Sequence, residues 1–400
     1  MDYDRNMKTP NKAGSLLYRV ENGRNLHNVF EVVMDDRING EHLKSAVEEA
    51  VRLYPPVGYS VVFEDGMTYF TDNDNDIVIP ESATGIVQGS KALNGHMFCV
   101  SYKDRKIRSN VSHMITDGGG MGRFASAVVR NYCRFHYGTD TVSARKFSDE
   151  ILLTDFFDLD YSDVTPVKEE VFEKQGFVLP ETIRGKEGIM NTAMCIVRVP
   201  EDRFMEFVKA NGTSVSVMLF LLLARSVYQN CPKAKDQTLA GRITVNARKQ
   251  LGIPDTFVNC SLGSQISVTE KEFAEEGFSG LGPRLRTSIK TQTSPEYLRY
   301  IAKGIADTGS FPTELRPTFT ISYMGAIDLA DCNDHVKDVV LYEGECHKLN
   351  VYTFGGEFRL VFHFADGSGK YAKGVADILR REGIDAVCDD MVILPEEEKG

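Results

Sequence analysis

The sequence predicts an α/β protein of the α+β type, with two lobes that each hold a mixed β-sheet covered by helices. The length of 400 residues suits two domains, because a domain commonly has about 100–200 residues. Strand-like alternation and helix-like spacing of apolar residues recur in both halves of the chain. A polar and less periodic stretch, from about residue 138 to residue 188, connects the halves. We therefore expect an N-terminal lobe over residues 1–185 and a C-terminal lobe over residues 186–400.

The first half predicts strands, a hairpin and two amphipathic helices. An apolar strand over residues 28–34 precedes a helix over residues 40–54, which Pro55 and Pro56 end because proline lacks the amide hydrogen. The elements that follow are strands over residues 58–64, 67–71 and 77–79, a hairpin of strands over 97–102 and 106–112, and a helix from the glycines at 118–120 to about residue 137.

The second half predicts a buried helix over residues 215–229, because this segment is apolar nearly all round. A strand over 192–199 and a helix over 201–210 come before it. The remaining expected elements are strands over 237–245 and 257–268, a helical segment over 270–308 broken at 280–283 and at 295, strands over 318–324, 336–341, 348–354 and 357–364, and a helix over 369–381.

Charge and composition exclude several classes of protein. The formal net charge of −11 argues against a nucleic-acid-binding protein, which would carry a basic surface. The longest purely apolar run, residues 217–224, is too short to span a bilayer, and the first residues lack the apolar core of a signal peptide. The eight cysteines include no Cys-x-x-Cys pair, and most have apolar neighbours. We therefore expect a cytoplasmic protein with reduced cysteines and no membrane span.

The segment around His113 carries the clearest chemical pattern. The strand over 106–112 alternates and leads into His113, which should point to the same side as Ile107 and Val111. A histidine at the end of a strand can be held rigidly at a cleft, and its ordinary pKa suits proton transfer. Asp117 comes four residues later, before three glycines that allow a sharp turn into the next helix. By itself, the pattern His-x-x-x-Asp-Gly also fits a buried histidine followed by a capped turn.

The same segment, Ser-His-Met-Ile-Thr-Asp-Gly-Gly-Gly-Met-Gly-Arg-Phe from Ser112 to Phe124, resembles the signature of the chloramphenicol acetyltransferase-like superfamily. That superfamily contains free-standing alcohol acyltransferases, polyketide-associated acyltransferases and the condensation domains of peptide synthetases. Other segments resemble it in the family's order: residues 46–55 with their Tyr-Pro step, the apolar helix within 211–224, Val-Asn-Ala-Arg at 245–248 with Asn259, and Ile-Ser-Tyr-Met-Gly at 321–325.

The resemblance implies a tunnel between the two lobes, with His113 at its midpoint as the general base. It also implies that Asp117 supports the loop through an ion pair with an arginine, either Arg248 or Arg19, and that Gly118 allows close packing. Ser322 and Tyr323 become the candidate donors to the oxyanion of the tetrahedral intermediate.

Two departures from the family pattern refine this expectation. Condensation domains usually carry two adjacent histidines, whereas Ser112 precedes His113 here. This difference favours a free-standing alcohol acyltransferase. Tyr323 stands where many relatives have asparagine, and the Asp-Phe-Gly-Trp-Gly segment of the plant branch is absent.

Basic residues supply candidates for binding the phosphates of coenzyme A. Arg284, Arg286 and Lys290 fall near one face of a helix after Pro283, where they can bind phosphate or form a solvated surface. Arg242, Arg248 and Lys249 form a rival cluster.

Two further patterns are weaker. Cys332 and His335, with Cys346 and His347, have irregular spacing for metal ligands, so we expect no metal. His363, followed by Asp366 and Gly367, is a shortened echo of the His113 pattern and is better explained as a strand-end turn.

We expect an acyltransferase that moves an acyl group from an acyl-thioester, with acyl-CoA as co-substrate, to a small hydroxyl or amine acceptor. Two alternatives remain open at this stage: a condensation or acyl-transfer protein that takes its acyl group from a carrier protein, and a non-catalytic binding protein with the same fold.

Overall fold

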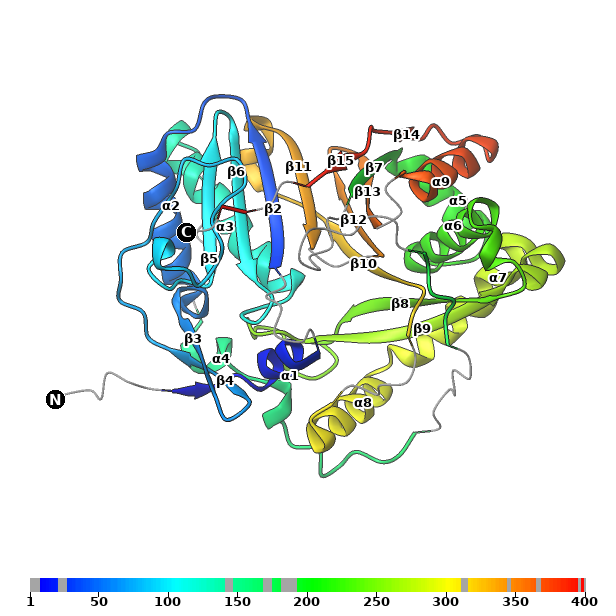
Figure 1. Cartoon of the computed structure of the whole chain (residues 1–400), viewed down its shortest axis with the longest axis horizontal. Coiled ribbons are helices and arrows are strands. Elements are labelled where there is room, and N and C mark those ends of the chain that lie inside the picture. The colour runs from blue at the N-terminus through cyan, green and yellow to red at the C-terminus, as the bar shows by residue number, and fades with distance from the viewer. Residues whose placement is uncertain are drawn as a thin grey trace.

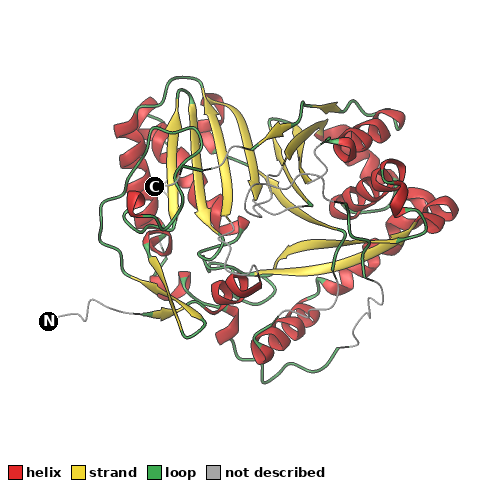
Figure 2. Cartoon of the chain, in the orientation of Figure 1, coloured by secondary structure: helices red, strands yellow, loops and turns green. Residues whose placement is uncertain are grey.

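The computed structural model of the chain describes residues 8–20, 27–140, 147–167, 175–180, 193–310, 316–343, 347–364, 368–394 and 397–398. It is a mixed α/β structure in which two main sheets stand side by side and helices pack on their outer sides (Figures 1 and 2). This is the predicted fold class.

Among the described residues, the sheet of the first lobe has four strands and is antiparallel throughout. In sheet order its strands are β11 (Val336–Glu343), β2 (His27–Met34), β6 (Lys106–Ser112) and β5 (Phe98–Lys103), and its helices are α2 (Gly40–Leu53) and α3 (Gly118–Tyr137). The two helices pack against each other, and their buried apolar side chains form one core with those of the strands. The bounds of β6 and α3 are those expected from the sequence.

The ends of α2 and α3 follow from local chemistry. The side chain of Asn39 accepts hydrogen bonds from the amides of Glu41 and His42 at 3.0 and 3.1 Å and so caps the start of α2. Pro55 comes two residues after its last residue, Leu53. The helix α3 ends at Gly138, whose φ of 73° is in the left-handed region that glycine adopts without steric cost.

The second lobe contains a larger, mixed sheet, with eight strands in the part of the chain that the structure describes. Along its main path lie β14 (Val387–Cys388), β7 (Ala193–Pro200), β13 (Glu357–Phe364), β12 (Lys348–Phe354), β10 (Phe319–Ala326), β8 (Thr238–Asn246) and β9 (Ser261–Thr269), and β15 (Val392–Ile393) also pairs with β7. Its helices are α5 (Glu201–Ala210), α6 (Val215–Asn230), α7 (Glu270–Gln292), α8 (Pro295–Thr308) and α9 (Lys370–Arg381). The helix α6 is buried on nearly every side, as its uniform apolar sequence predicts.

A small sheet and two short helices complete the first half. They are β1 (Thr9–Pro10), β4 (Met67–Thr71) and β3 (Ser60–Glu64), in that sheet order, with α1 (Lys12–Val20) and α4 (Asp149–Leu152). The sequence did not predict α1 or α4.

The sheet of the first lobe includes one strand from the second half of the chain. The strand β11 comes from the expected C-terminal lobe but pairs with β2 along the edge of the first sheet, from Val336 opposite Met34 to Glu343 opposite Asn28. This pairing satisfies backbone groups that would otherwise be exposed along the edge of β2. Near the C-terminus, Glu398 also donates its amide to the carbonyl of Gly85 in the first half at 3.0 Å.

Three element predictions are wrong in detail. Residues 77–79 form no strand, and the strand expected from residue 257 begins only at Ser261. The long helical segment breaks at Gly277, with φ 60° and ψ −166°, and not at residues 280–283, so Pro283 lies inside α7. A backbone with that positive φ is accessible to glycine, which explains the position of the break.

Among the described residues, no single helix has the length and hydropathy needed to cross a membrane. Taken together, α5 and α6 are long and apolar enough, but the two helices are bent by 88° relative to each other.

Candidate active site at the end of strand β6

A tight loop of five residues joins β6 to α3 and presents His113. The strand ends at Ser112, which pairs with His27. The amide of Ile115 donates a hydrogen bond to the carbonyl oxygen of Ser112 at 3.0 Å, which closes the turn. Asp117 then caps α3, because its side chain accepts a hydrogen bond from the amide of Gly120 at 3.0 Å. His113 is therefore the first residue after a rigid strand.

Asp117 ties this loop to the second half of the chain. Its carboxylate forms two hydrogen bonds of 2.8 Å with the guanidinium of Arg248 and also accepts from the amide of Cys260 at 2.9 Å and the hydroxyl of Ser261 at 3.1 Å. The ion pair that the resemblance implied between Asp117 and Arg248 is present. For Arg19, the structure describes the backbone within α1 but not the side chain.

The charge of Asp117 is strongly stabilised. Burial alone would raise the pKa of the Asp117 carboxyl, but the charge and hydrogen bonds of Arg248, together with the amides of Cys260 and Gly120, lower it to about 2. Asp117 is 1% exposed and every contact named above is internal. It supports the loop and does not face an open space.

Glycines allow close packing around the same loop. A Cβ added to Gly120 would lie 1.8 Å from Oγ1 of Thr116 and 2.8 Å from the carbonyl oxygen of Phe257. A Cβ added to Gly118 would lie 2.8 Å from Cε of Met324. A Cβ at Gly120 would therefore collide with Thr116 and with a backbone oxygen, whereas a Cβ at Gly118 would displace only the flexible end of Met324.

The imidazole of His113 lies between one residue from each of two distant segments. Its Nδ1 is 3.0 Å from Nδ2 of Asn259, and its Nε2 is 3.8 Å from Oε2 of Glu343 at the end of β11. Glu343 forms a buried ion pair with Lys348 at the start of β12. The side chain of His113 is 15% exposed, so the ring is largely enclosed where the two main sheets meet.

Sequence reasoning missed the roles of Asn259 and Glu343. Asn259 belonged to a segment that resembles the family, but nothing in it pointed to His113. Glu343 follows an apolar strand and precedes Lys348 by five residues, which is a common surface pattern. Its place beside His113 depends on β11 joining the first sheet, which no local pattern reveals.

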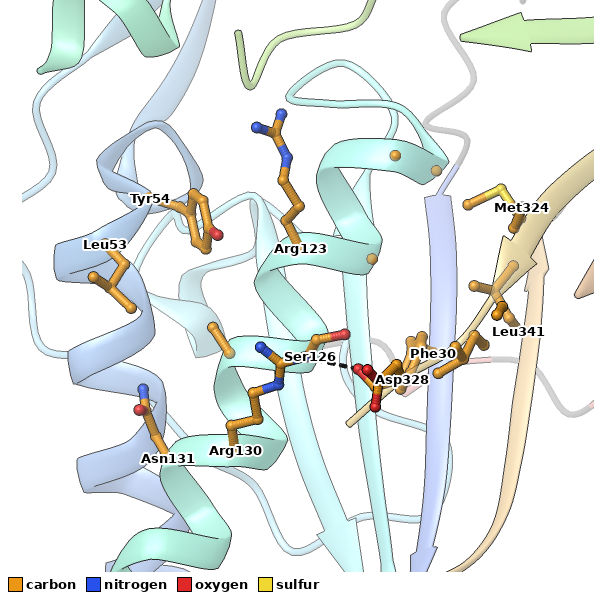
Figure 3. Close-up of a pocket in the computed structure, with 16 residues that line it drawn as sticks. Phe30, Leu53, Tyr54, Arg123, Ser126, Arg130, Asn131, Met324, Asp328 and Leu341 are labelled. Atoms are coloured by element: carbon orange, nitrogen blue, oxygen red, sulfur yellow. Dashed lines mark hydrogen bonds between the residues drawn. The ribbon is translucent and has the colours of Figure 1, made fainter. Parts of the chain in front are cut away.

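A cavity of about 350 Å³ lies between the first-lobe helices and the end of β10. Gly118 and Gly119 form part of its wall, beside Met324. Figure 3 shows Arg123 and Arg130 on α3 among the residues that line it. The other lining residues are Phe30, Leu53, Tyr54, Gly122, Ser126, Ala127, Asn131, Ala326, Ile327, Asp328 and Leu341.

The two candidate oxyanion donors have different surroundings. Ser322 is buried, and its hydroxyl lies 3.7 Å from the sulfur of Met324, the residue that also packs on Gly118. Tyr323 is 36% exposed, and its ring packs 6.0 Å from that of Phe358. Ser322 is therefore linked to the His113 loop through Met324, and no described contact of Tyr323 reaches that loop.

The basic residues proposed for coenzyme A lie on the exposed face of α7. Arg284 forms ion pairs with Glu272 and Glu276 at 2.9 and 3.1 Å, and Arg286 donates to the carbonyl of Gly212 at 3.4 Å. Lys290 is also exposed. No contact among the described residues joins these three side chains to His113.

Cys346, one of the residues considered as a metal ligand, lies outside the described residues. Within the described ranges, no three His, Cys, Asp or Glu side chains gather as a metal site.

No family model and no curated protein matches the sequence. The structure, in contrast, is similar to many solved structures over nearly its full length. TRI101 of F. sporotrichioides, solved with coenzyme A and T-2, matches with a TM-score of 0.61 and 12% identity over 95% of this chain and 98% of that chain. Polyketide synthase associated protein 5 from Mycobacterium tuberculosis matches with a TM-score of 0.64 and 10% identity over 93% and 96%.

A third similar structure, the epimerization domain from the third module of tyrocidine synthetase B, gives a TM-score of 0.62 and 11% identity over 94% of this chain and 95% of that chain. The chain therefore has the two-lobed α/β fold of these solved structures, which is the fold class that the sequence predicted. At these identities the similarity concerns the fold alone.

Proposed function

We propose that this chain transfers an acyl group from an acyl-thioester, with acyl-CoA as donor, to a small hydroxyl or amine acceptor, and that His113 is the central acid–base residue. One observation carries the proposal: the imidazole of His113 is held between Asn259 and Glu343 at the meeting of the two sheets. The Asp117–Arg248 ion pair fixes the loop that presents it.

Several features support the chemistry. Acyl transfer to a hydroxyl needs a group that moves a proton, a donor for the oxyanion and a space for the acceptor. His113 supplies the first, and the role expected for it from the sequence is that of general base. The hydroxyl of Ser322 is the better-placed candidate for the second, because of its link through Met324 to Gly118. The cavity of about 350 Å³ beside Gly118 is large enough for a small acceptor or acyl group.

Coenzyme A fits the proposal because TRI101, of the same fold, was solved with it. Condensation domains also have this fold, so the alternative hypothesis is that the acyl donor is bound to a carrier protein. The test is a thiol-release assay with a panel of acyl-CoA donors and of alcohol and amine acceptors, repeated with acyl groups loaded on a carrier protein. We expect release from free acyl-CoA. Release only from the carrier would favour a carrier-dependent enzyme.

The variant His113→Ala should lower turnover by about 10²–10⁴-fold, the usual contribution of an acid–base residue. Its fold should persist, because Asp117, Arg248 and the Glu343–Lys348 pair keep their contacts. The matched control is His42→Ala on α2, whose ring contacts His136. Equal activity in His113→Ala and the wild type would overturn the proposal, and acyl-thioester binding without turnover in the wild type would favour a binding protein.

A further inference from the structure

The cavity between α3 and the end of β10 contains a positive charge that no carboxylate pairs with. Arg123 on α3 lines this cavity (Figure 3). Its guanidinium donates to the backbone carbonyl oxygens of Asp255, at 3.2 Å, and of Thr256. Among the described residues, no aspartate or glutamate forms an ion pair with Arg123, and its Nε–H group has no hydrogen-bond partner. Arg123 therefore keeps donors and a full charge available at the edge of the cavity.

The surroundings of Arg123 leave its charge uncompensated. Burial lowers the pKa of the Arg123 guanidinium and the charge of Arg248 lowers it further, while Asp117 and Asp255 only partly oppose this shift. Asp328 also lines the cavity, but its carboxylate accepts hydrogen bonds at 2.8 and 3.1 Å from groups of its own loop. A bound anion would therefore gain the attraction of Arg123 without displacing an existing ion pair.

Two hydroxyl groups lie beside this charge. Tyr54 is buried, and its hydroxyl, directed toward α3 in Figure 3, has no hydrogen-bond partner among the described residues. Burial raises the pKa of Tyr54, and the nearby charges of Arg123 and Arg130 oppose this shift. Ser126 lies between the two arginines on the same face of α3, and its hydroxyl likewise has no partner in the described ranges. The charge and these donors form the convergent polar end of a small-molecule site.

The opposite end of the cavity is apolar and approaches His113. Met324 and Leu341 line this end together with Gly118. A Cβ built on Gly118 would lie 3.8 Å from Oε1 of Glu343, whose other carboxylate oxygen is 3.8 Å from Nε2 of His113. The volume of about 350 Å³ is near the lower end of the usual range for ligand pockets, so it suits a small acid and not the whole of coenzyme A.

We propose, on the basis of the proposed acyl transfer, that the acceptor is a small hydroxy- or amino-carboxylic acid and that Arg123 binds its carboxylate. The apolar part of the acceptor lies along Met324 and Leu341, and its hydroxyl or amine faces His113. The acceptor's oxygen or nitrogen bonds to the thioester carbon, and the carbon–sulfur bond breaks. The acceptor's proton passes through His113 to the leaving thiolate. The products are the acylated acid and the free thiol.

Matched acceptors test the substrate class. The thiol-release assay is run with ω-hydroxycarboxylic acids of increasing chain length, each beside its primary amide, which has nearly the same shape and no charge. We expect kcat/KM for the best acid to exceed that for its amide by at least about tenfold, because the amide cannot accept a charge-assisted hydrogen bond. Equal values for acids and amides, with thiol release intact, would overturn this inference and leave the acyl transfer in place.

Arg123→Gln tests the residue, because glutamine can still donate to a backbone carbonyl oxygen but has no charge. The KM for the acid should rise by about 10–100-fold, while the KM values for the amide and for acyl-CoA stay near those of the wild type. The matched control is Arg134→Gln on the same helix, whose partner Glu49 lies outside the cavity. A rise in the KM for acyl-CoA and not for the acid would overturn the proposal and assign Arg123 to the donor's phosphates.

A second variant keeps the contacts of Arg123 with the carbonyl oxygens of Asp255 and Thr256, which also hold the loop that contains them. Ser126→Asp adds a carboxylate to the same face of α3, where it can pair with the guanidinium of Arg123. We expect the KM to rise for the acid and not for the amide, with the free energy of unfolding close to that of the wild type. An unchanged preference for the acid in Ser126→Asp would count against the site.

Binding of an unreactive acid separates this inference from the proposed function. Isothermal titration calorimetry with phenylacetate, without any thioester, should show binding to the wild type and to Arg134→Gln. Arg123→Gln should bind phenylacetate at least about tenfold more weakly. Equal affinities, or no binding to the wild type, would overturn the inference even if thioester turnover is found. Binding that depends on Arg123, without turnover of any acceptor, would instead reject the proposed acyl transfer and leave the carboxylate site intact.

Discussion

Two histidines near the ends of strands, His113 after β6 and His363 near the end of β13, have different environments. His113 is 15% exposed and contacts Asn259 and Glu343 through its two nitrogens. His363 is fully buried, and neither ring nitrogen has a hydrogen-bond partner among the described residues. Its ring stacks on Tyr342 at 5.3 Å. Burial, with a further contribution from the charge of Lys348, lowers the pKa of His363 to about 3.

A single ion pair affects both histidines. Glu343 presents its carboxylate to His113, and Lys348, its partner, lies opposite His363 in the pairing of β12 with β13. The negative end of the pair therefore faces one ring and the positive end disfavours protonation of the other. Burial and neighbouring charge therefore distinguish two histidines that occupy similar positions at strand ends. The two sequence patterns are similar, although Asp366 and Gly367 lie outside the described residues.

The loop that presents His113 is held by the buried ion pair between Asp117 and Arg248. Removal of the charge of Asp117 should have the largest effect on stability. Asp117→Asn leaves the guanidinium of Arg248, which is 4% exposed, without its counter-charge. We expect the free energy of unfolding to fall by about 3–5 kcal/mol, the usual cost of breaking a buried pair. Urea unfolding at pH 7 measures it.

The matched control is Asp389→Asn, which removes the partner of Arg198 in a pair whose side chains are 37% and 35% exposed. That change should cost at most about 1 kcal/mol. Because the pKa of Asp117 is lowered in the folded protein to about 2, its contribution is complete above pH about 4 and is lost as the pH falls toward 2. Equal losses in the two variants would show that the Asp117 pair does not hold the loop.

The sequence predicted those parts of this region that depend on neighbours along the chain. The bounds of β6 and α3 and the cap by Asp117 follow from alternation, glycine and capping chemistry within residues 106–137. Arg248 was one of two arginines implied by the family resemblance. Glu343 could not be found, because its position requires β11 to cross between lobes. The burial of His363 likewise depends on strands far apart in the sequence, β7, β12 and β13.

Replacement of His363 should change the pH dependence of stability. The unfolded histidine has a pKa near 6.5 and the folded one a pKa of about 3, so the unfolded chain binds more protons between these values. Wild-type stability therefore falls as the pH drops below about 6.5, by about 1.4 kcal/mol per pH unit from this residue. His363→Phe removes this term. Between pH 7 and pH 5 we expect the variant to lose about 2 kcal/mol less than the wild type.

Urea unfolding at both pH values provides this measurement, and His42→Phe on the partly exposed surface of α2 is the control. If His363→Phe keeps the full wild-type pH dependence, His363 is protonated in the folded protein and the contrast with His113 fails. The proposed acyl-transfer activity at pH 7 should remain within about twofold, since His363 makes no direct contact with the His113 loop among the described residues.

The smallest effect is expected at Arg284, which lies on α7, away from His113 and His363. Arg284 on α7 already forms exposed ion pairs with Glu272 and Glu276. Arg284→Ala should lower the free energy of unfolding by at most about 1 kcal/mol, because exposed pairs contribute little. Glu272 and Glu276 already neutralise the guanidinium of Arg284, so the KM for acyl-CoA should be the same in Arg284→Ala and the wild type. Arg286→Ala is the matched comparison. A several-fold rise in KM that shrinks as salt is added would instead show that the phosphates of coenzyme A bind along α7.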